Sequence, residues 1–171
     1  MLNHSVPEST LIQIGDISVS FSLLESIIQL LAGSLISHEL RIGQIVSAEL
    51  SFRNLRALTI SLYLERFGED NEVTKIKDLM KRAGRIEDKR NQIIHSLWIV
   101  GIDEDHVTRI KGTAKEKHGF KIQEQDMNSS ELREIADEIK QLSKDMQDFL
   151  VQQYIRKQDF NFPPERTLKD L

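Results

Sequence analysis

The chain has 171 residues, 39% of them apolar and 29% charged, so it can form one hydrophobic core and is not disordered throughout. The absence of cysteine excludes disulfide bonds and cysteine-based zinc sites, and it fits a reducing compartment. The formal net charge of −4 gives no general sign of nucleic-acid binding.

The N-terminal region shows neither a secretion signal nor a membrane-spanning segment. Residues 1–8 lack a basic stretch followed by an apolar run. The most apolar segment, residues 27–36, is interrupted by polar residues and glycine and is shorter than a bilayer requires. We therefore expect a cytoplasmic protein with no membrane partner.

Two long helices are predicted in the first part of the chain. Residues 1–15 read as a flexible or extended arm that ends at Gly15. Between residues 16 and 35, apolar side chains recur at three- and four-residue steps, which predicts a central helix. A second pattern predicts one helix over residues 37–67, in which Gly43 marks a bend or a close helix contact.

A third helix is predicted from Asp70 or Asn71, either of which can cap it, through His95. Its apolar stripe is interrupted at Arg90, whose guanidinium cannot lose its charge and needs an anion or several acceptors. Residues 72–95 carry seven basic and four acidic side chains, a local charge of +3. This excess of positive charge favours binding of a polyanion, although a solvated charged helix face explains it equally well.

After Trp98 the periodicity changes from helical to alternating. Short strands at residues 98–100, 106–111 and 119–123 predict a small antiparallel β flap over residues 98–124. A final amphipathic helix then opens with Asn128 and Glu131, which are spaced as a capping pair. We expect a mainly α protein with one domain over residues 1–157 and a tail over residues 158–171.

Arg90, Asn91 and His95 could form a metal-independent phosphodiester site. Histidine can move a proton to or from a ribose hydroxyl, arginine can hold the phosphate, and asparagine can fix a phosphate oxygen. Asn91 and His95 share a helix face, whereas Arg90 lies about 140° around the helix from His95, so a ligand or a second copy must bring them together. A structural role remains open, with His95 at the helix C-terminus and Arg90 bonded to carbonyls, Glu25 or Glu49.

The segment Arg90-Asn91-x-x-x-His95, on a long helix followed closely by Trp98, resembles the Arg-polar-x3-His signature of HEPN domains. As an architecture the resemblance covers residues 15–157, but as a motif it covers only about six residues. It implies an up-down bundle of four to five helices that forms a homodimer with the two motifs facing each other.

The resemblance also implies a function. HEPN ribonucleases cleave RNA through a 2′,3′-cyclic phosphate without a metal or other cofactor, in bacterial toxin–antitoxin, defence or stress systems. Arg90, Asn91 and His95 would be the catalytic residues. The residues expected to bind the RNA substrate are Lys89, Arg85, Arg82 and Trp98.

The chain departs from one pattern in the family. Some HEPN toxins carry a tyrosine two residues after the histidine, which a partner nucleotidyltransferase modifies. Leu97 stands at that position here, so regulation by this partner is not expected.

The sequence is also compatible with two other functions. The first is a non-catalytic dimeric scaffold that binds RNA, a nucleotide or a protein. The second is an antitoxin-like protein that binds a protein partner, which rests on the aromatic tail containing Phe160 and Phe162. For a toxin, the expected partner is a cognate antitoxin or another protein. We expect no metal, because His4, His38 and His118 have no partner at ligand spacing and the acidic residues 103–105 cannot converge in a turn.

Overall fold

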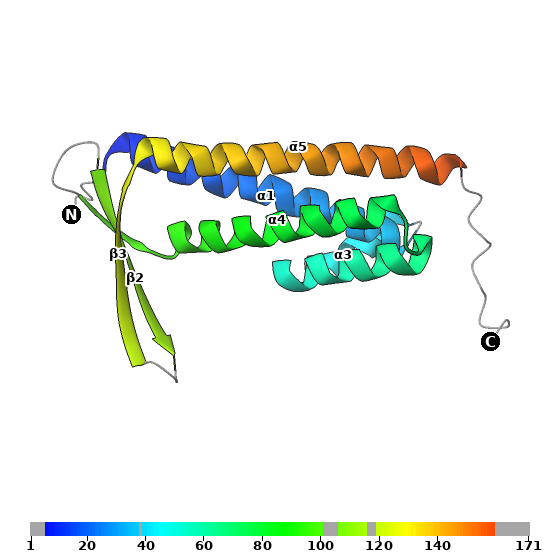
Figure 1. Ribbon diagram of the computed structural model, residues 1–171, viewed down its shortest axis with the longest axis horizontal. Coiled ribbons are helices and arrows are strands. Elements are labelled where there is room, and N and C mark those ends of the chain that lie inside the picture. The colour runs from blue at the N-terminus through cyan, green and yellow to red at the C-terminus, as the bar shows by residue number, and fades with distance from the viewer. Residues whose placement is uncertain (1–5, 38, 101–105, 116–118, 160–171) are drawn as a thin grey trace.

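The computed structural model describes residues 6–37, 39–100, 106–115 and 119–159, which form five helices and three strands (Figure 1). In chain order these are α1 (Glu8–Ile36), α2 (Leu40–Ala48), α3 (Phe52–Phe67), α4 (Asn71–Ile94), β1 (Leu97–Val100), β2 (His106–Lys115), β3 (Gly119–Asn128) and α5 (Ser129–Asp159). The expected mainly helical fold with a small antiparallel sheet before the last helix is confirmed.

The core lies between the long helices, with α1 at its centre. In Figure 1, α1, α3 and α5 run in one direction and α4 runs in the opposite direction. The α1 side chains Ile17, Leu24, Ile28, Leu31 and Leu35 are fully buried. Their neighbours in the core come from α3, α4, α5 and the base of the sheet. The prediction of a central first helix is therefore confirmed.

The prediction of an N-terminal arm up to Gly15 is wrong, because α1 begins at Glu8. The Leu11 N–H donates to the Pro7 carbonyl at 3.1 Å and starts the helix. Thr10 and Gln13 are buried although they are polar, so this first stretch packs against the bundle without showing an apolar stripe. Gly15 lies inside the helix.

By length and composition, α1 could also cross a bilayer. It is 29 residues long, and an 18-residue stretch of it has a mean hydropathy of 1.7. Of that stretch, 50% is buried inside the molecule. A core helix of a soluble protein has the same properties, and within the described ranges α1 is the one helix that has them. This apolar stretch is longer than residues 27–36, the segment considered from the sequence.

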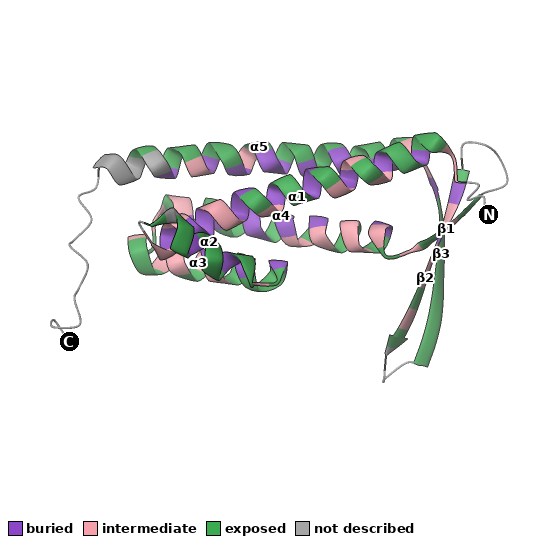
Figure 2. Cartoon of the chain, turned by 180° about the vertical axis from the view of Figure 1, so that it is seen from behind, coloured by how far each residue is buried: buried purple, intermediate pink, exposed green. Residues whose placement is uncertain are grey.

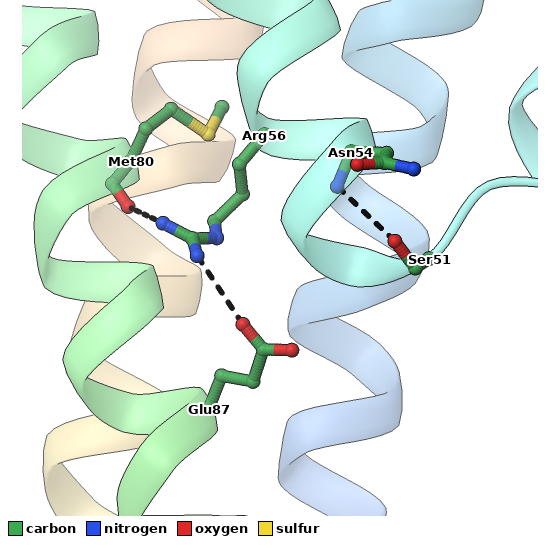
Figure 3. Close-up of polar contacts among 5 residues, drawn as sticks. All are labelled: Ser51, Asn54, Arg56, Met80 and Glu87. Carbon is green, nitrogen blue, oxygen red and sulfur yellow. Dashed lines mark hydrogen bonds and ion pairs between the residues drawn. The ribbon is translucent and has the colours of Figure 1, made fainter.

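The prediction of a single helix over residues 37–67 is also wrong, since residues 49–51 separate α2 from α3. Ser51 caps α3 by accepting a hydrogen bond from the Asn54 N–H at 3.3 Å (Figure 3). The break lets α2 fold back onto α1, where Gly43 meets Gly33. A Cβ atom on Gly43 would lie 2.3 Å from the Gly33 carbonyl oxygen. The expected close helix contact at Gly43 is confirmed.

The sheet has the order β1-β2-β3, with both pairs antiparallel. Strands β2 and β3 are longer than expected and pair from His106 with Asn128 to Lys115 with Gly119. Only the base of this hairpin joins the core, through Val107 and Met127. The rest extends past the bundle and is largely exposed (Figure 2).

Helix α5 closes the bundle and begins with the predicted capping pair. The Glu131 N–H donates to Asn128 Oδ1 at 3.0 Å, and the Asn128 N–H donates to Glu131 Oε2 at 2.9 Å. The helix continues to Asp159, slightly beyond the expected boundary at residue 157. Phe160, Phe162 and the rest of the tail lie outside the described residues.

The contact between α1 and α2 predicts opposite effects for two glycine substitutions. We expect Gly43→Ala to lower the free energy of unfolding by about 2 kcal/mol, because the new methyl group meets backbone atoms that cannot rotate away. Gly15→Ala is the control, since a Cβ atom there meets nothing within 4 Å; it should raise stability by up to about 1 kcal/mol. Urea unfolding monitored by circular dichroism would measure both. Equal stability of the two variants would contradict the close contact.

Candidate functional site

The Arg90–His95 motif lies on the last turn of α4, where the helix meets the sheet. His95 is the C-terminal cap, and its N–H donates to the Asn91 carbonyl at 3.3 Å. Its side chain is exposed, and no hydrogen bond or ion pair joins its imidazole to any described residue. The imidazole is therefore available to a ligand or to a second molecule.

Arg90 faces α1 instead. Its guanidinium carbon lies 5.2 Å from the centre of the Phe21 ring, a cation–π distance. Its NH1 group donates to Asn91 Oδ1 at 3.0 Å, whereas its buried Nε finds no acceptor among the described residues. Neither Glu25 nor Glu49, the carboxylates considered from the sequence, bonds to it. This half-buried cation thus has only a neutral acceptor and retains donors for an anion.

Asn91 connects the motif to the sheet. Its side-chain oxygen is occupied by Arg90, and its carbonyl lies 3.5 Å from the Lys111 ammonium, which donates to it from β2. Lys111 was not anticipated, because only the register of the strands brings it to the end of α4. No bond joins the His95 side chain to Arg90, as expected from their positions around the helix, and none joins it to Asn91, although these two residues share a helix face.

The four residues expected to bind substrate have different surroundings. Arg82 forms an ion pair with Asp145 at 2.7 Å, and Lys89 pairs with Glu138, so both are directed to α5. Arg85 is exposed. The Trp98 indole N–H donates to the Ile93 carbonyl at 3.1 Å, which fastens the first strand to the end of α4.

A polar contact between α3 and α4 borders the motif (Figure 3). Arg56 donates to the Met80 carbonyl at 3.0 Å and to Glu87 at 3.3 Å. Arg56 is therefore not a solvated surface charge, because it bonds to a helix that is distant in sequence. Gly84 makes room for it, since a Cβ atom there would lie 2.4 Å from Arg56 NH1. Glu87, one turn before Arg90, is thereby already engaged.

A second polar cluster, which sequence reasoning missed, lies beside the motif. Arg109 on β2 is only 5% exposed, and its burial lowers the pKa of the guanidinium. It donates to the Gln92 carbonyl at 3.2 Å, to Ser96 Oγ at 3.5 Å and to Gln125 Oε1 at 2.7 Å. The one signal in the sequence is its position two residues after Val107, on the same face of the strand.

Arg109 borders a pocket of about 360 Å³ between the end of α4, the base of β2 and β3, and the first turns of α5. This volume lies in the range of small-molecule sites, roughly 300–1,000 Å³. Arg90, Asn91 and His95 do not line it. The two polar clusters therefore occupy different sides of the end of α4.

Among the described residues, no group of three or more His, Asp or Glu side chains could hold a metal ion. His4, His38, His118 and the acidic residues 103–105 lie outside those residues.

Comparison of the chain with family models, curated proteins and solved structures finds no match in any of the three. The resemblance to HEPN domains accordingly rests on the motif and on its place at the end of a long helix.

The contact of Arg56 with Glu87 makes a specific prediction about stability. We expect Glu87→Ala to lower the free energy of unfolding by about 2 kcal/mol, because it leaves a half-buried guanidinium without its carboxylate. Asp88→Ala removes the neighbouring exposed carboxylate and should change stability by less than about 0.5 kcal/mol. Thermal and urea unfolding of both variants would test this. Two equally stable variants would show that the ion pair contributes nothing.

Proposed function

We propose that the protein is a metal-independent endoribonuclease of HEPN type, acting as a cytoplasmic homodimer in a bacterial toxin, defence or stress system. The observation that carries the proposal is that the motif contains both an exposed His95 with an unbonded imidazole and an Arg90 whose hydrogen bonding is incomplete. Both belong to the last turns of one helix, in the order of the HEPN motif.

The chemistry of RNA cleavage needs what these residues can supply. The ribose 2′-oxygen attacks phosphorus, the bond from phosphorus to the 5′-oxygen breaks, and a 2′,3′-cyclic phosphate forms. A base must take the proton of the 2′-hydroxyl, and an acid must protonate the leaving 5′-oxygen. Imidazole titrates near neutrality and can do either, while Arg90 would stabilise the charge that develops on the phosphate oxygens. Asn91 would orient the Arg90 guanidinium.

A second copy of the chain would supply what one copy lacks. Each motif contributes one imidazole, whereas the reaction uses both a base and an acid. The surface next to the motif also favours association, because β1 is an edge strand and its apolar side chains Leu97, Ile99 and Val100 are exposed. An exposed apolar edge strand is a ready pairing surface.

The alternative is a non-catalytic dimeric scaffold that binds RNA, a nucleotide or a partner such as an antitoxin. It is favoured by the engagement of Arg82, Lys89 and Trp98 within the molecule, which reduces the positive charge offered to RNA. A scaffold would not require an unbonded histidine at the cap of α4, and this histidine favours the ribonuclease.

Cleavage of RNA in the presence of EDTA tests the ribonuclease directly. We expect the wild-type protein to produce fragments ending in 2′,3′-cyclic phosphate. Arg90→Ala and His95→Ala should each reduce the rate by about 100-fold or more, the usual range for losing an acid–base or charge-stabilising group. Asp88→Ala, an exposed neighbour on α4, is the matched control and should retain activity. Intact RNA with the wild-type protein, or full activity of His95→Ala, would refute the proposal.

The dimer can be tested at the β1 edge. Leu97→Glu should convert a dimeric mass into a monomeric one by light scattering at micromolar concentration, and RNA cleavage should fall with it. Ile45→Glu on α2 is the control, because both residues are 63% exposed and only Leu97 adjoins the motif. A monomeric wild-type protein, or a dimer that survives Leu97→Glu, would contradict this arrangement.

A further inference from the structure

The pocket beside Arg109 is built around a buried cation with no anionic partner. Its three acceptors are a backbone carbonyl, a hydroxyl and a side-chain amide, all of them neutral. No ion pair within the described part of the chain involves Arg109. A guanidinium carries five N–H groups, so these three contacts leave donors that can face a molecule in the pocket.

The other charged groups of the pocket are mostly engaged already. Lys89 is paired with Glu138, and Glu131 accepts the hydrogen bond that caps α5. Glu134, in contrast, is exposed and has no hydrogen bond or ion pair with any described residue. The pocket therefore presents one strong group of donors, Arg109, and one strong acceptor, Glu134.

The overall charge of the pocket argues against an inorganic or multiply charged anion. Two basic side chains, Lys89 and Arg109, face three acidic ones, Glu131, Glu134 and Glu138, which gives a formal charge of −1. The remaining walls include the apolar side chains of Ile93, Met127 and Ile135. These features favour a neutral, flat group that offers acceptors on one edge and donors on another.

Among the RNA bases, guanine has this pattern. Its O6 and N7 atoms are adjacent acceptors, which arginine can bind with two parallel hydrogen bonds. Its N1–H and N2 amino group are adjacent donors, which a carboxylate can accept together. Adenine presents an acceptor at N1 where guanine presents a donor, and the pyrimidines have no counterpart of N7. We propose that this pocket binds the guanine base of a nucleotide, with Arg109 facing O6 and N7 and Glu134 accepting from N1 and N2.

The inference rests on the proposed function in one respect, which is that the base arrives as part of an RNA. A guanine held here would lie on one side of the end of α4, and the phosphodiester would lie near His95 on the other. Gln92 links the two regions, since it lines the pocket and its carbonyl accepts from Arg109 three residues before His95. The pocket would then select which nucleotide next to the cleaved bond is accepted.

Calorimetric titration with the four 5′-mononucleotides tests the site on the full chain. We expect 5′-GMP to bind saturably and at least about tenfold more tightly than AMP, CMP or UMP, as expected for a pair of base-edge contacts. Glu134→Gln should weaken GMP binding by about tenfold, because the amide has lost the charge that accepts both donors. Glu65→Gln, an exposed carboxylate on α3 outside the pocket, is the matched control and should bind GMP like the wild type.

A second variant tests the other side of the base. Arg109→Lys keeps the charge but loses the planar fork, so the preference for GMP over AMP should disappear. Circular dichroism would show whether this variant is folded, and Glu134→Gln decides the question if it is not. Absence of saturable GMP binding, equal affinity for all four nucleotides, or unchanged affinity of Glu134→Gln would each overturn the inference.

The outcome is separable from that of the ribonuclease. His95→Ala should bind GMP like the wild type, because His95 does not line the pocket. GMP binding without RNA cleavage would leave this site standing and remove the proposed function. RNA cleavage by a protein that binds GMP no more tightly than the other nucleotides would support the proposed function and remove the guanine site.

Discussion

The burial of α1 is the interaction on which the rest of the structure depends. Every other helix packs against it, and its inward side chains are closed off from solvent along most of its length. This arrangement needs two accommodations. The α2 backbone must reach α1 closely enough that only glycine fits at residue 43, opposite Gly33, and polar side chains near the start of α1 must be buried. Together these two features fix the position of α1, against which α4 packs.

The end of α4 is held by side chains of the sheet. Trp98 bonds to it from β1, and Arg109 and Lys111 bond to it from β2. A helix terminus usually frays, because its last carbonyls lack partners within the helix. Here side chains bond to the carbonyls of Ile93, Gln92 and Asn91, so the turn that carries the motif is fixed in position. Such support is what a precise binding or catalytic geometry requires.

Features that depend on local sequence were predictable. The last helix, its capping pair and the three short strands follow from periodicity and from the residues at their ends. The early start of α1 was missed because Thr10 and Gln13 are polar and yet buried. The break before Ser51 was missed because the apolar periodicity continues across it.

The site was predictable only where its residues are adjacent in the chain. Arg90, Asn91 and His95 could be recognised together from their spacing. The partners of Arg56 are 24 and 31 residues away from it, and those of Arg109 lie 13 to 17 positions away, so neither environment can be read from a pattern. The partners of a charged side chain that packs into a core can be identified only from the tertiary structure.

The parallel packing of α1 and α5 has a consequence for how the chain folds. Asp16 on α1 is bonded to Lys140 on α5, 124 positions later, and Tyr63 to Gln153, 90 positions later. Contacts of such long sequence separation require the closure of large loops and slow the folding reaction. During synthesis, the side of α1 that packs against α5 stays uncovered until α5 has left the ribosome. The nascent chain is then a target for chaperones over most of its translation.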